Sequence, residues 1–396
     1  MEEVRPTSNK QSGLLALLDE LEKRRVSDAE KTNAMRAYLD TKAREKGIPV
    51  HGTFELTPLC NLDCKMCYIH LTEQQVRQTG KKMLNGSQWI AIMEQTIQAG
   101  MVDALLTGGE AMSHPDFDEI YLYLHSKGIG IAVNTNALLM TKERVDFFRR
   151  YRPRSIQITL YGSDDESYER VTGRRCFSKV MDAIECIRDA GLVMHIGITP
   201  NRYMSGKGES LIELIESLGV SYSINSSLMT PREETGRSDV AHDLSLDEYV
   251  QLYKAQARRR KIKLSPMRPE DIPCPGGGHE EAAKGLCCAA GRSSFCVGWE
   301  GFIRPCVSLM EIRADASQEP FASAWQKIQK AVREYPVPRE CIGCIYQAVC
   351  CPCVVEHAVG SLPGHANPAF CQRARRFANE GLWEILERNE KEGERK

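Results

Sequence analysis

The chain has 396 residues, of which 42% are hydrophobic and 27% charged, and its 52 basic and 53 acidic side chains leave a net charge of −1. We expect one large domain and one smaller one, because a single small core would not need this length. The balanced charge favours neither nucleic-acid binding nor a polybasic membrane surface, and the acidic start is no signal peptide. We therefore predict a cytoplasmic protein without nucleic-acid or membrane partners.

Residues 1–47 carry apolar side chains three and four positions apart, which predicts a helical N-terminal extension. Beyond them, short apolar runs alternate with amphipathic stretches, as strands alternate with helices. The predicted strands are 52–57, 102–108, 130–136, 155–162, 193–200 and 220–227. Such a repeat implies an α/β fold with a parallel sheet, either closed as a barrel or open and doubly wound. In both, ligands bind at the carboxyl ends of the strands.

A helix over 245–263 closes this unit, and we place the domain at 48–264. The texture then changes, because residues 265–288 are rich in Pro and Gly and most of the sixteen cysteines fall in 265–396. Residues 293–306 read as a hairpin that turns at Glu300 and Gly301. In a long chain without an export signal, clustered cysteines are more often metal ligands than disulfide partners. We predict a second domain that is held together by metal and ends in a helix.

Three cysteines, Cys60, Cys64 and Cys67, directly follow the first predicted strand. A loop with this spacing can bind three irons of a [4Fe–4S] cluster and leave the fourth iron open. Half a zinc site and three unrelated loop cysteines are the alternatives. The position at the carboxyl end of a strand favours a functional site.

This CxxxCxxC loop, followed by Gly108-Gly109-Glu110 after the second strand, resembles the radical S-adenosylmethionine (SAM) superfamily. The resemblance covers about residues 50–245 and implies a partial (β/α)6 barrel of TIM-barrel type. It also implies that the amino and carboxylate groups of SAM chelate the open iron, and that the reduced cluster cleaves SAM to a 5′-deoxyadenosyl radical. An electron donor such as flavodoxin or ferredoxin would reduce the cluster.

The same resemblance indicates which side chains would contact SAM. The expected residues are Gly108, Gly109 and Glu110 at the amino group, Asn134 and Asn136 at the ribose or methionine, Thr159 on the fourth strand, Arg174 or Arg175 at the carboxylate, and Ile198 beside adenine. Glycines let backbone carbonyls approach an ammonium group closely, and guanidinium suits a carboxylate. For each polar residue, an ordinary place at the edge of the barrel is the alternative.

The C-terminal cysteines form a second motif, which resembles the SPASM extension of radical SAM enzymes with its two auxiliary iron–sulfur clusters. By this resemblance the outer cluster is held by Cys341, Cys344, Cys350 and Cys371, and the inner one by Cys288, Cys306 and Cys353, with Cys274, Cys287 or an open position as the fourth ligand. The implied cofactors are three [4Fe–4S] clusters and SAM. The interval before Cys353 is one residue shorter than usual and Cys351 adjoins Cys350, so the ligands there stay open; a zinc ribbon is the alternative.

SPASM domains most often accompany radical SAM enzymes that modify peptides or proteins. We predict an enzyme that abstracts hydrogen from a residue of a ribosomally synthesised peptide, leading to crosslinking or another oxidative modification. The alternatives are formylglycine formation as in anaerobic sulfatase maturation, a small-molecule dehydrogenase or epimerase, and a non-catalytic Fe–S electron-transfer protein. Val307 disfavours the first, because those relatives carry an aspartate there as a base. Cys176 and Cys296 are candidate hydrogen-atom donors.

Overall fold

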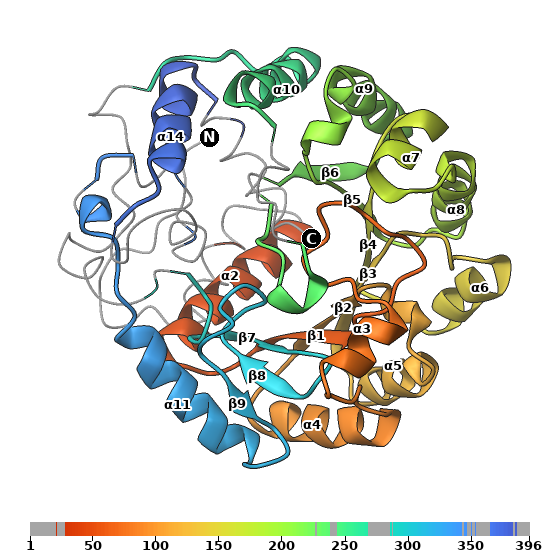
Figure 1. The fold of residues 1–396 in the computed structure, drawn as a ribbon, viewed down its shortest axis with the longest axis vertical. Coiled ribbons are helices and arrows are strands. Elements are labelled where there is room, and N and C mark those ends of the chain that lie inside the picture. The colour runs from red at the N-terminus through yellow and green to blue at the C-terminus, as the bar shows by residue number, and fades with distance from the viewer. Residues whose placement is uncertain are drawn as a thin grey trace.

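A sheet of parallel strands, with helices around its outer side, forms the centre of the molecule (Figure 1). The computed structural model describes residues 28–225, 228–237, 244–267, 288–342, 344–346 and 365–382, with the single residues 21, 286, 350, 353 and 385. Within them the strand order is β6-β5-β4-β3-β2-β1-β7-β8-β9. The strands are β1 His51–Thr57, β2 Asp103–Gly108, β3 Gly130–Thr135, β4 Ser155–Thr159, β5 Met194–Ile198, β6 Ser221–Ile224, β7 Ser294–Val297, β8 Phe302–Arg304 and β9 Ala314–Asp315.

Strands β1 to β6 lie in chain order, and each pairs in parallel with the next. This order decides between the two predicted architectures, because a doubly wound sheet reverses its strand order at a switch point and these strands do not. The partial (β/α)6 barrel is thereby confirmed. The helices that follow its strands are α3 Glu73–Gln78, α4 Gly86–Gln98, α5 Phe117–Ser126, α6 Lys142–Arg150, α7 Asp165–Thr172, α8 Phe177–Asp189, α9 Gly208–Leu218 and α10 Leu246–Arg259.

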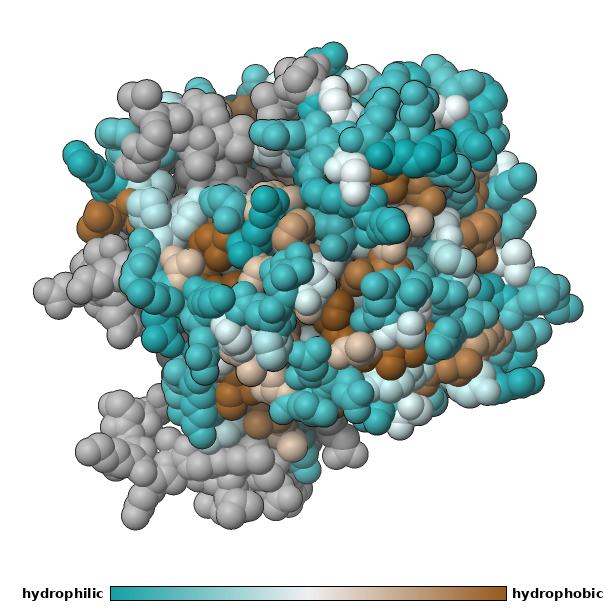
Figure 2. Space-filling view, turned by 60° about the horizontal axis from the view of Figure 1, so that its bottom comes forward, coloured by the Kyte–Doolittle hydropathy of each residue, from teal (hydrophilic) through white to brown (hydrophobic). Residues whose placement is uncertain are grey.

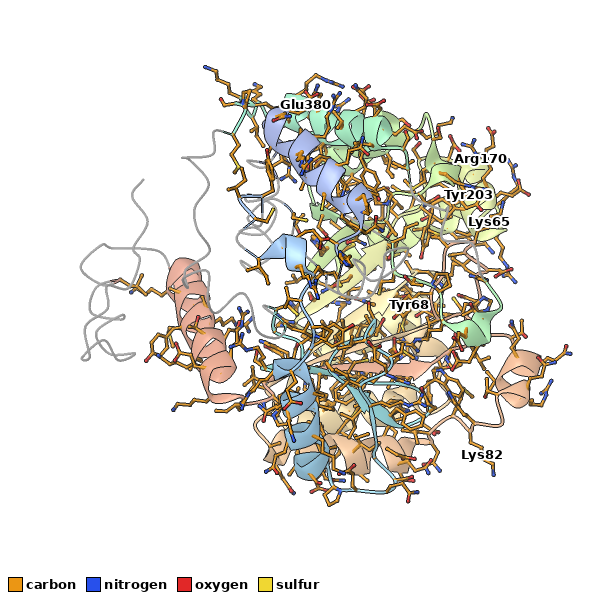
Figure 3. The ribbon with its side chains drawn as sticks, turned by 60° about the vertical axis from the view of Figure 1, so that its left-hand side comes forward. Lys65, Tyr68, Lys82, Arg170, Tyr203 and Glu380 are labelled. Carbon is orange, nitrogen blue, oxygen red and sulfur yellow. The ribbon has the colours of Figure 1, made fainter. Side chains whose placement is uncertain are left out.

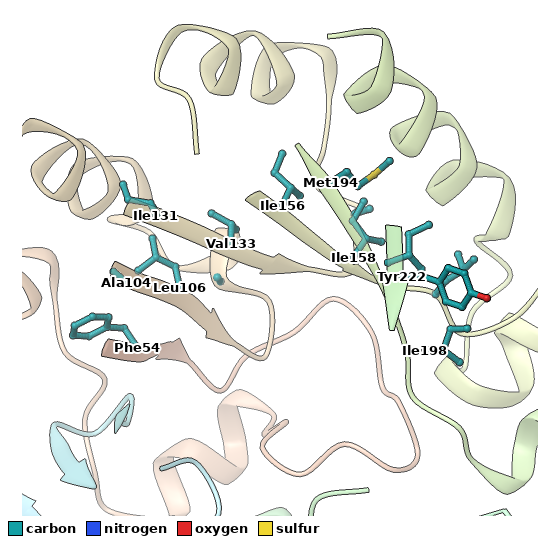
Figure 4. Close-up of a cluster of buried hydrophobic side chains, with 14 of the residues drawn as sticks. Phe54, Ala104, Leu106, Ile131, Val133, Ile156, Ile158, Met194, Ile198 and Tyr222 are labelled. Carbon is teal, nitrogen blue, oxygen red and sulfur yellow. The ribbon is translucent and has the colours of Figure 1, made fainter. Parts of the chain in front are cut away.

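Alternate residues of each strand face opposite sides of the sheet, and the two sides differ in chemistry. One side packs against the helices and is apolar, as Figure 4 shows for Phe54, Leu106, Val133, Ile156 and Ile158. The other side faces the barrel lumen and is polar. Its residues include Glu55 of β1, Thr107 of β2, Asn134 of β3, Gln157 of β4 and His195 of β5. Burial of the apolar side stabilises the fold, and the polar lumen remains available for a ligand.

The predicted hairpin of the C-terminal region is confirmed, and it joins the barrel sheet. Strand β7 pairs in parallel with β1, with Cys296 opposite Thr53, and β8 returns antiparallel to β7. Gly301 makes the turn at φ +90°, a left-handed value that favours glycine. The domain boundary at residue 264 remains a prediction, and the sheet runs across it.

Further helices pack around the barrel ends. They are α2 Asp28–Lys46, α11 Phe321–Arg333 and α14 Pro368–Asn379, with short 3-10 turns η1 Ala111–Ser113, η2 Arg202–Met204, η3 Glu233–Thr235 and η6 Arg339–Cys341. The indole Nε1 of Trp325 donates to the Gly47 carbonyl at 2.8 Å, which fixes α11 to the end of α2. Lys254 of α10 forms an ion pair with Glu380 at 2.7 Å, just after α14. Residues 28–46 of the predicted extension are helical, and residues 1–20 and 22–27 lie outside the described part.

The face in Figure 2 is mostly hydrophilic, with hydrophobic side chains in separate patches between polar ones. Among the described helices, none combines the length and the apolar composition that crossing a bilayer requires.

Candidate functional site

The loop after β1 gathers the three cysteines at the carboxyl end of the barrel. Backbone N–H groups already point at two of the sulfurs: Leu62 N lies 3.4 Å from Cys60 Sγ, and His70 N lies 3.3 Å from Cys67 Sγ. Burial raises the pKa of the Cys60 thiol to about 12, and it also raises the pKa of Cys64 and Cys67. Each of these pKa values is raised further by a neighbouring thiolate of the loop or a nearby carboxylate. Three converging thiols of this kind need a cation or cluster to remain ionised.

Arg237 stabilises this loop from outside. Its guanidinium donates to the carbonyl oxygens of Cys64 and Cys67 and forms an ion pair with Asp63. The end of α7 holds the loop from another side, because Asp63 N and Lys65 N donate to the carbonyls of Thr172 and Val171 at 3.2 and 3.0 Å. The loop is therefore fixed by groups that leave its cysteine sulfurs free to bind a ligand.

The Gly108-Gly109-Glu110 segment lies directly against the start of the cysteine loop. Gly109 N donates to Thr57 O at 2.7 Å, and Glu110 N donates to Leu59 O at 3.0 Å. A Cβ atom on Gly109 would stand 2.3 Å from Leu59 O, so this close approach requires glycine. The structure thus brings together the two motifs that the sequence separates by forty residues.

The Glu110 side chain is fully buried and bound by three donors. Asn136 N donates to Glu110 Oε2 at 2.9 Å, Thr135 Oγ1 at 3.0 Å, and Met112 N donates to Oε1 at 3.3 Å. Burial raises the pKa of Glu110 to about 7, and these hydrogen bonds limit the rise. Glu110 therefore positions the Asn136 backbone, and its protonation depends on pH near neutrality.

This pKa predicts a pH effect on the stability of the metal-free protein. A folded-state pKa of about 7, above the unfolded value near 4.5, contributes stability that is present below about pH 4.5 and lost as pH rises through 7. From pH 5 to 8 we expect the wild type to lose about 1–3 kcal/mol relative to Glu110→Gln, which cannot titrate. Urea unfolding of both proteins at several pH values measures this difference. A constant difference across the range would contradict the raised pKa.

The polar lumen contains a cavity of about 370 Å³, whose walls include Asn134, Gln157, Thr159, His195 and Gly197. Asn134 Nδ2 donates to Thr107 Oγ1 at 3.4 Å, and its buried Oδ1 has no partner. A buried acceptor without a donor is costly unless a ligand supplies one. Two predicted SAM contacts, Asn134 and Thr159, therefore line a space with unmet hydrogen-bonding capacity.

Asn136, a third predicted contact, interacts with the cysteine loop. Its Nδ2 donates to Asn61 Oδ1 at 2.7 Å and lies 3.6 Å from Cys60 Sγ. Hydrogen bonds to its sulfurs help to set the reduction potential of an iron–sulfur cluster. The Asn136 amide is placed to make such a bond to a cluster that is held by Cys60. The converging thiols, the glycine approach and the free Asn134 acceptor fit a SAM-binding cluster.

The structure corrects the expectation for the Ile198 side chain. Ile198 is fully buried in the hydrophobic core between sheet and helices (Figure 4), whereas Gly197 lines the lumen cavity. The alternation of side chains along β5 causes this, because neighbours point to opposite faces. Only backbone in this stretch remains available to a ligand in the lumen.

The two arginines predicted at the SAM carboxylate are exposed, and Arg175 forms an ion pair with Glu169 at 3.0 Å. Sequence reasoning missed Arg170, which lies one turn earlier on α7. Its Nε and Nη2 atoms are buried and have no hydrogen-bond partner. The residue immediately after it, Val171, accepts the hydrogen bond from Lys65 N in the cysteine loop. Arg170 is thus a third guanidinium candidate beside the site, and its Nε and Nη2 donors are unused.

A buried charged network on the lumen side of β1 was also missed. Glu55 forms an ion pair with Arg232, whose Nη2 lies 2.6 Å from Oε2 and 2.8 Å from Oε1, and Tyr68 Oη donates to Oε1 at 2.8 Å. The same Nη2 lies 3.3 Å from Val307 O, while Nε and Nη1 are buried without partners. Tyr68 follows Cys67 and Val307 follows Cys306. Arg232 therefore connects the loop of the SAM-cluster cysteines to the loop of a predicted auxiliary ligand.

The structure groups the C-terminal cysteines in two sets. Charges on Cys371, Cys341 and Cys344 add to burial in raising the pKa of Cys350 to about 12, so these four lie near one another. Cys288 similarly raises the pKa of Cys306, and both Cys306 and Cys353 act on Tyr335. The assignment of these cysteines to an outer and an inner cluster stays a prediction, and Cys274 and Cys287 lie outside the described residues. Among the described residues, no group of three or more Cys, His, Asp or Glu side chains is placed to hold a metal ion.

The two candidate hydrogen-atom donors differ in their surroundings. Cys176 is the N-cap residue of α8 and belongs to the hydrophobic core cluster. Cys296 is fully buried on β7, and the charges of Glu55 and Arg232 act on its thiol. Burial raises the pKa of Cys296 well above its usual value, so its proton is retained. Of the two, Cys296 lies with the lumen network.

Comparison with known proteins agrees with this geometry. Residues 54–220 match the family described as Radical SAM superfamily. The sporulation killing factor maturation protein SkfB of Bacillus subtilis is 25% identical over 65% of this chain and 60% of its own length. The AdoMet-dependent heme synthase of Methanosarcina barkeri is 25% identical over 76% of this chain and 89% of its own length. The chain thus spans less than two thirds of SkfB.

Among solved structures, SuiB of Streptococcus suis, crystallised with S-adenosylmethionine, has the same fold. It superimposes with a TM-score of 0.64 at 16% identity, covering 90% of this chain and 87% of that one. The fold match extends beyond the barrel into the C-terminal region. The cysteine loop, the adjoining glycine segment and the family match together identify residues 54–220 as a radical SAM domain.

Proposed function

We propose that this protein is a radical SAM enzyme that modifies a ribosomally synthesised peptide. It would cleave SAM reductively and abstract hydrogen from a peptide residue, leading to a crosslink or another oxidative modification. The observation that carries the proposal is the contact between the Cys60–Cys67 loop and the glycine segment, where Glu110 N donates to Leu59 O at 3.0 Å. A protein that only stores or passes electrons needs no such second motif against its cluster loop.

In this proposal Cys60, Cys64 and Cys67 bind a [4Fe–4S] cluster, which supplies the electron that cleaves SAM. Gly108 and Gly109 bring backbone close to the SAM amino group, and Asn136 is held by Glu110 beside Cys60. The lumen cavity positions the remainder of SAM along Asn134 and Thr159, and Arg170, with its two buried and unpartnered nitrogens, is the guanidinium proposed for the carboxylate.

We also propose two auxiliary [4Fe–4S] clusters, the outer at Cys341, Cys344, Cys350 and Cys371, and the inner at Cys288, Cys306 and Cys353. The mutual effects among these thiols support the grouping. None of the thirteen described cysteines forms a disulfide, and a reducing compartment such as the cytoplasm suits cysteines that serve as cluster ligands.

The peptide substrate is supported by two relatives. SkfB is named for the maturation of a killing factor, and a structure of SuiB with its precursor peptide SuiA matches this chain with a TM-score of 0.64. The heme synthase, matched over 89% of its own length, favours a small molecule as the second candidate substrate. Mass spectrometry distinguishes them, because a peptide maturase changes the mass of a peptide and a small-molecule enzyme does not.

The first test measures 5′-deoxyadenosine formed from SAM by the anaerobically reconstituted, dithionite-reduced protein. We expect formation in the wild type and its loss in a Cys60→Ala/Cys64→Ala/Cys67→Ala variant, because that variant cannot bind the cluster. Cys186→Ala, which removes an exposed cysteine of α8, is the control and should keep the activity. Equal 5′-deoxyadenosine from the triple variant and the wild type would overturn the assignment of the loop.

A further inference from the structure

The outer face of the cysteine loop reaches solvent at Lys65, directly beside a proposed ligand of the SAM cluster. Cys64 and Met66 point inward and are buried, whereas Lys65 between them is exposed. Lys65 is exposed to solvent and adjoins the proposed ligand Cys64 in the chain, so no helix or strand separates solvent from this part of the loop. An electron that enters the protein here arrives at the residue that adjoins Cys64 in the chain.

This face carries an unusual arrangement of cations around one aromatic ring. Lys65 Nζ lies 4.6 Å from the centre of the Tyr203 ring, and the Arg202 guanidinium lies 5.4 Å from it. Figure 3 shows Lys65 and Tyr203 next to each other at the outer edge of the molecule, with Arg170 close by. Each contact of this kind contributes about 0.5–1 kcal/mol at exposed sites, so the Tyr203 ring favours the gathering of both cations on this face.

The end of α7 adds further positive charge. Val171 and Thr172 at the end of α7 accept hydrogen bonds from the cysteine loop. Arg174 and Arg175 come two and three residues later in the chain, so these exposed side chains lie near the loop. We call Lys65, Arg174, Arg175, Arg202 and Tyr203 the Lys65 surface. Arg175 forms an ion pair with Glu169, and the nearby Asp63 forms one with Arg237. Within the described residues, Lys65 and Arg174 have no carboxylate within 4.0 Å, so their charge faces solvent.

We propose that the Lys65 surface is the docking site for an acidic protein that carries one electron, such as flavodoxin. The inference rests on the proposed function, since it assumes a cluster at Cys60, Cys64 and Cys67. In the transfer the reduced flavin loses one electron and no proton, and the cluster gains that electron. Opposite charges on the two partners would steer their encounter and fix the flavin over the loop.

The test uses flavodoxin in its hydroquinone form and the reconstituted enzyme. The variant Lys65→Glu/Arg202→Glu reverses the two charges that flank Tyr203. Its matched control, Lys330→Glu/Arg333→Glu, reverses two exposed cations at the end of α11, on the opposite side of the molecule from α7 (Figure 1). Two quantities are measured at low salt: the Kd for flavodoxin, and 5′-deoxyadenosine formed with flavodoxin or with dithionite as reductant.

We expect the Kd for flavodoxin to rise by about 10-fold or more in the Lys65→Glu/Arg202→Glu variant. The rate of 5′-deoxyadenosine formation with flavodoxin as reductant should fall by a similar factor. The dithionite-driven rate should stay unchanged, because dithionite needs no docking surface. Raising the salt concentration should weaken wild-type binding more than binding by the variant.

Three results would overturn the docking site. They are an unchanged Kd in the variant, an equal effect in the α11 control, and an equal loss with dithionite, which would indicate a damaged cluster loop. If the wild type forms no 5′-deoxyadenosine with either reductant, the proposed function fails, and the Kd comparison still decides whether the surface binds flavodoxin.

Discussion

Replacing Arg232 by leucine is expected to destabilise the protein by about 3–5 kcal/mol, because it leaves the Glu55 carboxylate buried without its counter-ion. The side chains of Arg232 and Glu55 are only 6% and 0% exposed, so water cannot replace the lost guanidinium. Tyr68 would still donate one hydrogen bond to Glu55, which is too little for a buried charge. The shift of the urea midpoint relative to the wild type measures the loss.

Two further variants separate this explanation from general damage. Glu55→Gln/Arg232→Leu removes both charges and should recover most of the lost stability. Arg258→Leu breaks an ion pair with Glu209 whose side chains are 57% and 66% exposed, and should cost at most about 1 kcal/mol. If the double variant is as unstable as Arg232→Leu alone, the uncompensated charge is not the cause.

The barrel could be predicted from the sequence because its signals are local. Each of its six strands is a short apolar run, and the described strands lie inside the predicted ranges or start one residue earlier, as β1 does at His51. The signal of the three-cysteine loop is equally local, since Cys60, Cys64 and Cys67 lie close together in the sequence. The hairpin at Glu300 and Gly301 could be predicted for the same reason.

The remaining parts of the site depend on contacts between distant residues. Arg232 lies 177 positions from Glu55 in a segment without regular structure, and no sequence period marks it as buried. Arg170 was passed over in favour of Arg174 and Arg175, because only the fold shows that its nitrogens are buried without partners. The Ile198 side chain is a different case. Alternation along the strand places it on the face of Ile196 and the core, and that signal was available in the sequence.

These distant contacts tie the proposed SAM site to the C-terminal region. Arg232 N donates to Tyr68 O at 3.0 Å, and its side chain reaches Val307 O, so one residue contacts both cysteine-bearing loops. Because Nε and Nη1 have no partner, the guanidinium retains donors for an acceptor in the lumen. Loss of Arg232 would therefore disturb the relative position of the two loops as well as stability.

The second large effect is expected at Gly109, where alanine should greatly reduce both cluster incorporation and SAM binding. The added Cβ would stand 2.3 Å from Leu59 O and 2.8 Å from Pro58 O. Both are backbone atoms, so they cannot move aside as a flexible side chain would; the whole Pro58–Leu59 segment must shift, and Cys60 with it. Overpacking of this kind costs about 1–3 kcal/mol, and we expect SAM affinity to fall by about 10-fold or more.

Iron content after anaerobic reconstitution and the Kd for SAM measure this effect. The control is Gly128→Ala in the turn before β3, where φ is +71° but no atom lies within 4 Å of the added Cβ. It should lower stability by about 1 kcal/mol through backbone strain alone and leave iron and SAM binding intact. If Gly109→Ala binds iron and SAM as the wild type does, the close approach of the two segments does not position the cluster loop. If only Gly109→Ala loses both, the contact between the glycine segment and Leu59 is what holds Cys60 in place for its ligand.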